Sequence, residues 1–152
     1  MKEFEFNLEK VLKVRNIKEK MAQREFYNAR QQAEELRSQI EQLNSAQKRV
    51  YNHLRKKSEI DPNHAIQARR FLRHNRGEIE SVSEDLSEQE KVVENKRKRL
   101  KERAKKRQAM EKLKENKAEK YYKEVRREEQ KKIDDITQFQ SKENESANIF
   151  SG

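Results

Sequence analysis

The apolar residues of the chain recur in steps of four and three, the spacing that lines side chains along one face of a helix. In the first half this seam starts at Leu8, and from Ala22 onward only Gln47 interrupts it with a polar residue. A disordered polar sequence rarely keeps such a seam, so the pattern predicts a coiled-coil helix over residues 3–57. The first seam comprises Leu8, Leu12, Arg15, Glu19, Ala22, Phe26, Ala29, Ala33, Leu36, Ile40, Leu43, Gln47, Val50 and Leu54.

A turn is predicted at residues 58–61, where Pro62, the chain's one proline, interrupts the pattern. Asp61 is a suitable N-cap, and Pro62 suits the first helical position because its missing N–H would have no partner there. A second helix is therefore predicted over residues 62–140. Its seam comprises Ala68, Leu72, Asn75, Ile79, Val82, Leu86, Gln89, Val93, Lys96, Leu100, Arg103, Arg107 and Met110.

The short turn makes the two helices antiparallel neighbours. If the chain folds back about residue 61, facing residues have numbers that add up to 122, so that Leu43 faces Ile79. Apolar positions then meet apolar positions along most of the seam, and the polar Gln47 meets the polar Asn75. This agreement favours a hairpin within one molecule over a parallel dimer. The predicted fold class is all-α, a long antiparallel two-helix coiled-coil hairpin that resembles a stalk.

The second predicted helix is longer than the first, so its last turns have no facing segment. Under this register Tyr122, Val125, Ile133 and Ile136 are left without an apolar partner from the same chain. They are predicted either to bind another protein or to pack on the first helix in a shifted register. Residues 142–152 show no helical periodicity and are predicted to form a flexible tail.

Composition excludes several classes of protein. With 43% charged and 31% hydrophobic residues, and a mean hydropathy of -1.46, the chain has too little apolar surface for a globular core. The absence of cysteine excludes a disulfide framework, a thiolate nucleophile and a cysteine-based zinc site. There is also no apolar run of signal-peptide or membrane-span length, so we expect a cytoplasmic protein.

A basic run follows an acidic stretch in the second predicted helix. Residues 96–107 hold nine basic residues with Glu102 as the one acid, whereas residues 78–95 hold seven acids and only Lys91 as a base. The favoured interpretation is the solvated face of a coiled-coil helix. Two alternatives stay open: an acidic protein partner, and nucleic acid bound through phosphate contacts alone. No stacking aromatics or fold fingerprint accompany the run, so we do not expect nucleic acid.

No constellation for catalysis is apparent. In the predicted register the three histidines, His53, His64 and His74, do not converge on one metal site. There is no glycine-rich phosphate loop, and the carboxylates lie along helices instead of around a pocket. We therefore expect no enzymatic activity, no cofactor, no bound metal and no small-molecule substrate.

Two stretches near the ends of the chain resemble the FliJ family of flagellar export proteins. LKENKAEKYYKEVRREEQKKIDDI, residues 113–136, resembles the closing motif of the family, and FEFNLEKVLKVRNIKEK, residues 4–20, resembles its start. The most specific part is residues 129–135, which match the family's Glu-Gln-Lys-x-hydrophobic-Asp-Glu pattern with Asp135 in place of the final Glu. Length and hairpin layout are also similar, so the resemblance covers nearly the whole chain.

The resemblance implies a non-enzymatic cytosolic component of the flagellar type III export apparatus, peripheral to the inner membrane. It implies a central stalk, similar to the γ subunit of rotary ATPases, whose terminal end binds the hexameric export ATPase. Contacts with the cytosolic domain of the export gate and with export chaperones are also implied. The candidate ATPase-binding residues are Tyr121, Tyr122, Val125, Gln130, Ile133, Asp134, Asp135 and Ile136.

The resemblance also assigns Phe71 as the candidate residue for binding the export gate, because the family has an aromatic residue early in its second helix. Four residues later the family has an apolar residue, whereas this chain has Asn75. The structural alternative for Phe71 is packing at the seam edge beside Leu72. Two other functions stay open for the chain: a basic coiled-coil protein that binds nucleic acid, and a structural spacer that self-assembles.

Overall fold

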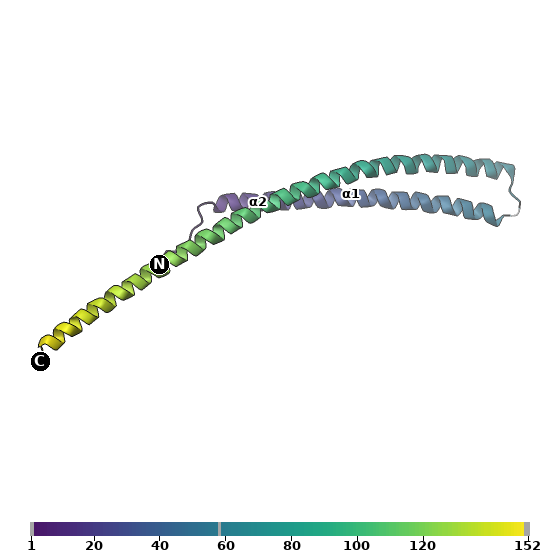
Figure 1. Ribbon diagram of the computed structural model, residues 1–152. Coiled ribbons are helices and arrows are strands. Elements are labelled where there is room, and N and C mark those ends of the chain that lie inside the picture. The colour runs from purple at the N-terminus through teal and green to yellow at the C-terminus, as the bar shows by residue number, and fades with distance from the viewer. Residues whose placement is uncertain (1, 58, 151–152) are drawn as a thin grey trace. The chain divides into compact units, whose positions relative to one another are not determined.

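The chain folds into two α-helices, α1 (Glu9–Lys56) and α2 (Pro62–Phe150), shown in Figure 1. The computed structural model describes residues 2–57 and 59–150, and within these ranges it contains no strand. The helices pack against each other as an all-α hairpin, which confirms the predicted fold class. Contacts divide the chain into two units. The terminal unit comprises Met1–Arg15 and Lys106–Gly152, and the hairpin unit comprises Asn16–Lys105.

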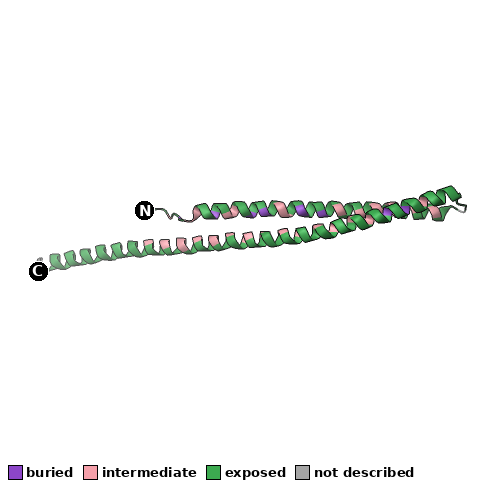
Figure 2. Cartoon of the chain, turned by 90° about the horizontal axis from the view of Figure 1, so that it is seen from above, coloured by how far each residue is buried: buried purple, intermediate pink, exposed green. Residues whose placement is uncertain are grey.

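Both predicted seams are confirmed, because each of their side chains is buried or half-buried. In Figure 2 the buried and intermediate positions recur along the helices between exposed positions. The deepest apolar side chain is Ala33, with 2% of its surface exposed, and Ala22 and Ala29 are each 5% exposed. A methyl side chain lets two helix backbones approach closely, so these alanines are covered more completely than the larger Leu36 and Ile40.

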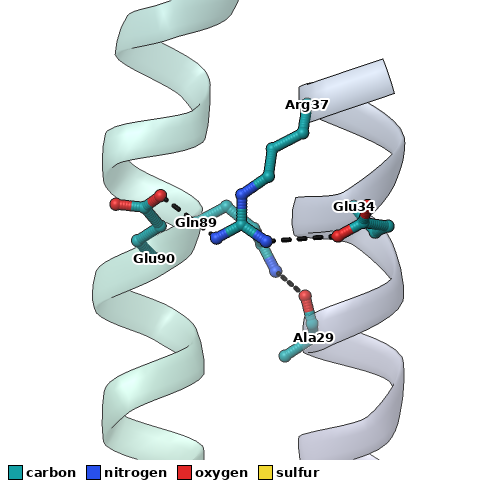
Figure 3. Close-up of polar contacts among 5 residues, drawn as sticks. All are labelled: Ala29, Glu34, Arg37, Gln89 and Glu90. Atoms are coloured by element: carbon teal, nitrogen blue, oxygen red, sulfur yellow. Dashed lines mark hydrogen bonds and ion pairs between the residues drawn. The ribbon is translucent and has the colours of Figure 1, made fainter. Parts of the chain in front are cut away.

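Polar contacts across the seam fix the antiparallel register of the hairpin unit. The Gln89 side chain donates to the Ala29 carbonyl at 3.1 Å, and Arg37 pairs with Glu90 at 3.3 Å. Figure 3 shows the Arg37 guanidinium between Glu90 of α2 and Glu34 of its own helix. The hydrogen bonds that Arg37 donates to these two carboxylates raise its pKa. Each side chain thus reaches a residue about one helical turn from the one that the predicted register places opposite it, on either side of that register.

The start of α2 has the predicted cap. The Asp61 side chain accepts a hydrogen bond from the Asn63 backbone N–H at 3.3 Å, and the Asp61 carbonyl accepts one from Ala65 at 3.0 Å. Pro62 then occupies the first helical position, where it has no N–H to leave unpaired. Residue 58 of the predicted turn lies outside the described residues.

The N-terminal boundary differs from the prediction, because α1 begins at Glu9 instead of residue 3. Residues 2–8 are non-helical, and the Glu9 N–H donates to the Phe6 carbonyl at 3.1 Å in a turn. Phe6 is only 7% exposed, and the Phe4 ring contacts that of Tyr121. Burying two aromatic rings against α2 outweighs the few helical hydrogen bonds that this short segment would gain.

The C-terminal boundary also differs, because α2 continues to Phe150, where an end near residue 140 was expected. Residues 142–150 are thus helical, although a flexible tail was predicted from residue 142. Lack of apolar periodicity removes packing but does not end a helix. This segment consists largely of residues with fair helix propensity and has no proline or glycine before Gly152. Residues 151–152 lie outside the described residues.

Asn75 forms a polar layer inside the seam. It is 3% exposed, its amide donates to the Leu43 carbonyl at 3.2 Å, and its Oδ1 has no partner. A buried acceptor without a partner costs free energy, and a buried asparagine can specify the register of a coiled coil. Asn75 therefore lowers the stability of the hairpin but specifies one alignment of the two helices.

Replacing Asn75 with leucine (Asn75→Leu) is expected to raise the free energy of unfolding by about 1–3 kcal/mol, because the unpaired buried oxygen disappears. The Leu43 carbonyl keeps its bond within α1. Thermal unfolding followed by circular dichroism measures the gain, and Asn52→Leu at an exposed position serves as control. A lower melting temperature for Asn75→Leu than for the unmodified chain would contradict this account.

Candidate protein-binding surfaces

An aromatic cluster ties the N-terminal segment to α2 in the terminal unit. The Phe4 ring lies 5.6 Å from the Tyr121 ring and 6.5 Å from the Tyr122 ring, measured between centroids. The Tyr121 hydroxyl donates to the Lys2 carbonyl. Tyr121 is consequently half-buried, whereas Tyr122 remains 52% exposed. Of these two predicted ATPase-binding residues, Tyr122 is the one that offers a free surface.

Charged groups hold the same segment along α2. The Lys117 ammonium lies 5.8 Å from the centroid of the Phe6 ring and donates to the Asn7 side chain at 3.3 Å. Lys114 pairs with Glu9 at 2.9 Å. A cation over an aromatic face and a half-exposed ion pair each contribute modestly. Together with the aromatic cluster, they fix the non-helical segment in place.

Beyond this segment α2 carries an exposed apolar stripe. Tyr122, Val125, Ile133 and Ile136 recur at helical spacing and share one face of α2. Val125 is half-buried, but Ile133 and Ile136 are 55% and 59% exposed. Residues 126–149 are exposed throughout, which Figure 2 shows as the green end of α2. We call these four residues the terminal stripe.

The polar candidates lie beside the terminal stripe. The Gln130 side chain donates to the Asp134 carboxylate at 3.1 Å, one turn along the helix. Asp135 is exposed and lies on another side of α2. The candidates therefore form an amphipathic helix surface, with an apolar face flanked by an amide and carboxylates. Such a surface can bind a protein groove but offers no enclosed pocket for chemistry.

Phe71 lies near the turn of the hairpin unit. It is 42% exposed and lines a groove of about 500 Å³ together with Val50 and Leu54. Asn75, one turn later, is buried in the seam instead of facing solvent with Phe71. The Phe71 ring is therefore accessible to a partner protein, whereas the Asn75 side chain is not.

The basic run contains several bases that already have carboxylate partners. Lys96 and Arg99 lie 3.2 Å and 3.9 Å from Glu25 of α1, and Arg97 lies 2.7 Å from Glu94. The hydrogen bonds from Arg97 lower the pKa of Glu94. Farther along, Arg107 pairs with Glu111 at 2.7 Å. These pairs agree with the favoured interpretation of a charged helix face.

The structure adds two observations on other site types. Within residues 2–57 and 59–150, no group of three histidine or acidic side chains is arranged to hold a metal ion. Neither of the two helices, over its described residues, has an apolar stretch that could cross a bilayer. His64 and His74 instead lie beside Asp61 and Glu78 of their own helix region, at 3.4 Å and 3.0 Å.

Sequence reasoning missed two aromatic residues of the terminal unit. The Phe4 ring packs on Tyr121, although a helix that began at residue 3 would have placed Phe4 elsewhere. Phe139 is 64% exposed at the edge of the terminal stripe, three residues after Ile136. The three-residue spacing was a usable signal for Phe139. The contact of Phe4 had none, because it depends on a non-helical segment.

Comparison with known proteins supplies the family. The family model described as flagellar FliJ protein matches residues 4–146 of the chain. No curated protein and no solved structure matches. The matched span includes α1, the turn, the terminal stripe and most of α2. The chain therefore belongs to the FliJ family, whose members are non-catalytic components of the flagellar protein export apparatus.

Proposed function

We propose that this protein binds the hexameric export ATPase through the terminal stripe and acts there as a central stalk. The observation that carries the proposal is the exposure of Ile133 and Ile136 on a continuous helix whose neighbouring residues are all exposed. A single helix with one apolar face needs a concave apolar partner to cover it. The central opening of a ring of subunits offers such a surface on all sides.

The energetics favour this use of the stripe. A large aliphatic side chain gains about 1.5–3 kcal/mol when it is fully buried. Ile133 and Ile136 retain more than half of their surface for burial. Gln130 and Asp134, which are hydrogen-bonded to each other, flank the stripe and can exchange that bond for polar contacts at the rim, which give orientation more than affinity. The exposed Asp135 faces another side of a ring that surrounds the helix.

Contact with the cytosolic domain of the export gate is proposed for the surface around Phe71. Its half-exposed ring lines an apolar groove, and an aromatic anchor is a common centre of a protein interface. Binding through both surfaces would couple the ATPase to the gate, on the cytoplasmic side of the inner membrane. Interactions with export chaperones form part of the same proposal, through surfaces that we do not assign.

The proposal predicts that adding the protein changes the turnover or the hexamer assembly of the export ATPase. ATP hydrolysis is measured at rising concentrations of the protein, and pull-downs use the ATPase and the gate's cytosolic domain as separate baits. Capture by both baits, with a saturable change in hydrolysis, is the expected result.

Two results would contradict the proposal and favour another function. Retention of DNA or RNA at low salt that falls steeply and log-linearly with salt, without any effect on the ATPase, would favour the nucleic-acid alternative. Light scattering that shows concentration-dependent self-assembly, again without an effect on the ATPase, would favour a structural spacer.

A further inference from the structure

The hairpin unit has a second groove near its turn, and Phe71 does not line this groove. Its volume is about 940 Å³, and both helices and the turn contribute to it. Tyr51, Ile60 and Ile66 line it with 36%, 41% and 53% of their surfaces exposed. Leu72, which is 9% exposed, also lines it. We call this the arginine groove, for the side chains described next.

Three arginines line the α2 side of the groove. Arg69, Arg73 and Arg76 follow one another at helical spacing, and all three are exposed. Among the described residues, no carboxylate pairs with any of their guanidinium groups, and Arg76 donates to the Tyr51 hydroxyl at 2.9 Å. Among the described residues that line this groove, Glu80, one turn farther on, is the one acid. The wall therefore carries positive charge that no carboxylate of the described residues neutralises.

Gly77 gives the groove a bare backbone surface. A Cβ atom built on Gly77 would meet nothing within 4 Å, and the φ angle of Gly77 is not positive. The hairpin itself thus has no steric need for glycine here, although glycine inside a helix costs about 1 kcal/mol relative to alanine. A position without a side chain permits close approach by a second backbone.

We propose that the arginine groove binds an amphipathic α-helix of another protein, with its apolar side on Ile66 and acidic residues facing Arg69 and Arg73. Both walls of the groove are helices whose backbone groups are already hydrogen-bonded, so the groove has no strand edge to pair with an extended peptide. A helical ligand satisfies its own backbone and can lie close over Gly77. Unpaired guanidinium groups select carboxylates.

Neither Phe71 nor the terminal stripe lines the arginine groove, although Leu54, Ile60 and Ala68 line both this groove and that of Phe71. Phe71 lines the other groove, and the terminal stripe belongs to the terminal unit. Variants of the arginine groove should leave the response of the export ATPase unchanged. The proposal does not depend on the identity of the ATPase partner.

The test uses a designed helical peptide of about 18 residues, with leucines along one face, glutamates beside them and a single tryptophan. The chain contains no tryptophan, so fluorescence of the peptide reports binding directly. The variant Gly77→Met is expected to weaken peptide binding about tenfold by filling the space above the backbone, and Arg73→Glu by a similar factor through charge reversal.

Matched controls separate this site from general charge attraction. Arg70→Glu makes the same charge change at an exposed position that lines neither groove, and it should alter affinity by less than about twofold. Gly77→Met should keep full helical content by circular dichroism, because methionine has a higher helix propensity than glycine.

Three results would overturn the proposal. One is equal weakening by Arg70→Glu and Arg73→Glu, and another is equal binding of a peptide with lysine in place of glutamate. The third is binding to vesicles of anionic phospholipid without binding of the acidic peptide, which would assign the groove to a membrane surface.

Discussion

Replacing Ile133 and Ile136 together with aspartate is expected to abolish the effect of this protein on the export ATPase at concentrations where the unmodified protein saturates it. Each isoleucine loses an apolar contact worth about 1.5–3 kcal/mol when buried, and each aspartate adds a charge that must lose water. A loss of about 3 kcal/mol corresponds to more than about 100-fold in affinity. Titration of ATP hydrolysis against each variant measures the shift.

The matched control for this experiment is Ile149→Asp. Ile149 of α2 is 76% exposed, and helical spacing puts it on the face opposite Tyr122 and Ile133. Its replacement should leave the titration unchanged. If Ile149→Asp weakens the ATPase response as much as the double variant, the terminal stripe is not the binding face. An unchanged response in both variants would reject the stripe as well.

The largest expected effect on stability comes from Leu12→Ala in the terminal unit. Leu12 is 5% exposed in the seam, and removing three carbons from a buried leucine costs about 2–5 kcal/mol. We expect the lower part of this range, because two helices enclose a side chain less fully than a globular core does. Since the whole free energy of unfolding of small proteins is about 5–15 kcal/mol, the melting temperature should fall clearly.

Leu113→Ala provides the control, because it makes the same chemical change at a position that is 36% exposed in the same unit. We expect a change below about 1 kcal/mol, since this leucine makes only partial contacts. Denaturant unfolding followed by circular dichroism gives both values. Equal destabilisation by the two substitutions would show that the seam does not hold the terminal unit together.

The two seams and their register could be predicted from the sequence because each depends on a repeated local rule. A heptad pattern decides which face of each helix is buried, and a short turn next to Pro62 decides that the second helix runs back along the first. The polar Asn75 also lies in the seam as predicted, but its amide donates to the Leu43 carbonyl, whereas Gln47 was the expected facing residue. The heptad pattern depends on many residues, so a single charged seam position such as Arg15 does not change which face of the helix is predicted to be buried.

The start of α1 and the end of α2 could not be predicted in the same way. The start of α1 is decided by long-range contacts of Phe4 and Phe6 with α2, which no local pattern encodes. The end of α2 depends on propensity alone, and the apolar pattern stops before the helix does. The apolar pattern reports neither the aromatic contacts that decide the start of α1 nor the helix propensity that decides the end of α2.

The candidate surfaces were predictable only as exposed positions. Ile133 and Ile136 could be identified because the facing segment had run out, and their exposure agrees with that. The register left Tyr122, and not Tyr121, without a facing residue, but the contact that half-buries Tyr121 comes from Phe4 and was not predicted. The arginine groove likewise had no local signature, because Tyr51 and Ile66 come from different helices and meet only after folding.

The alanines of the seam have a consequence for how this sequence can drift. At Ala22, Ala29 and Ala33 any larger residue must push the two backbones apart, whereas at Leu36 or Ile40 another aliphatic residue of similar volume fits the same space. Over evolutionary time, the three alanines should therefore accept little besides glycine and serine, while the bulkier layers exchange freely among leucine, isoleucine and methionine.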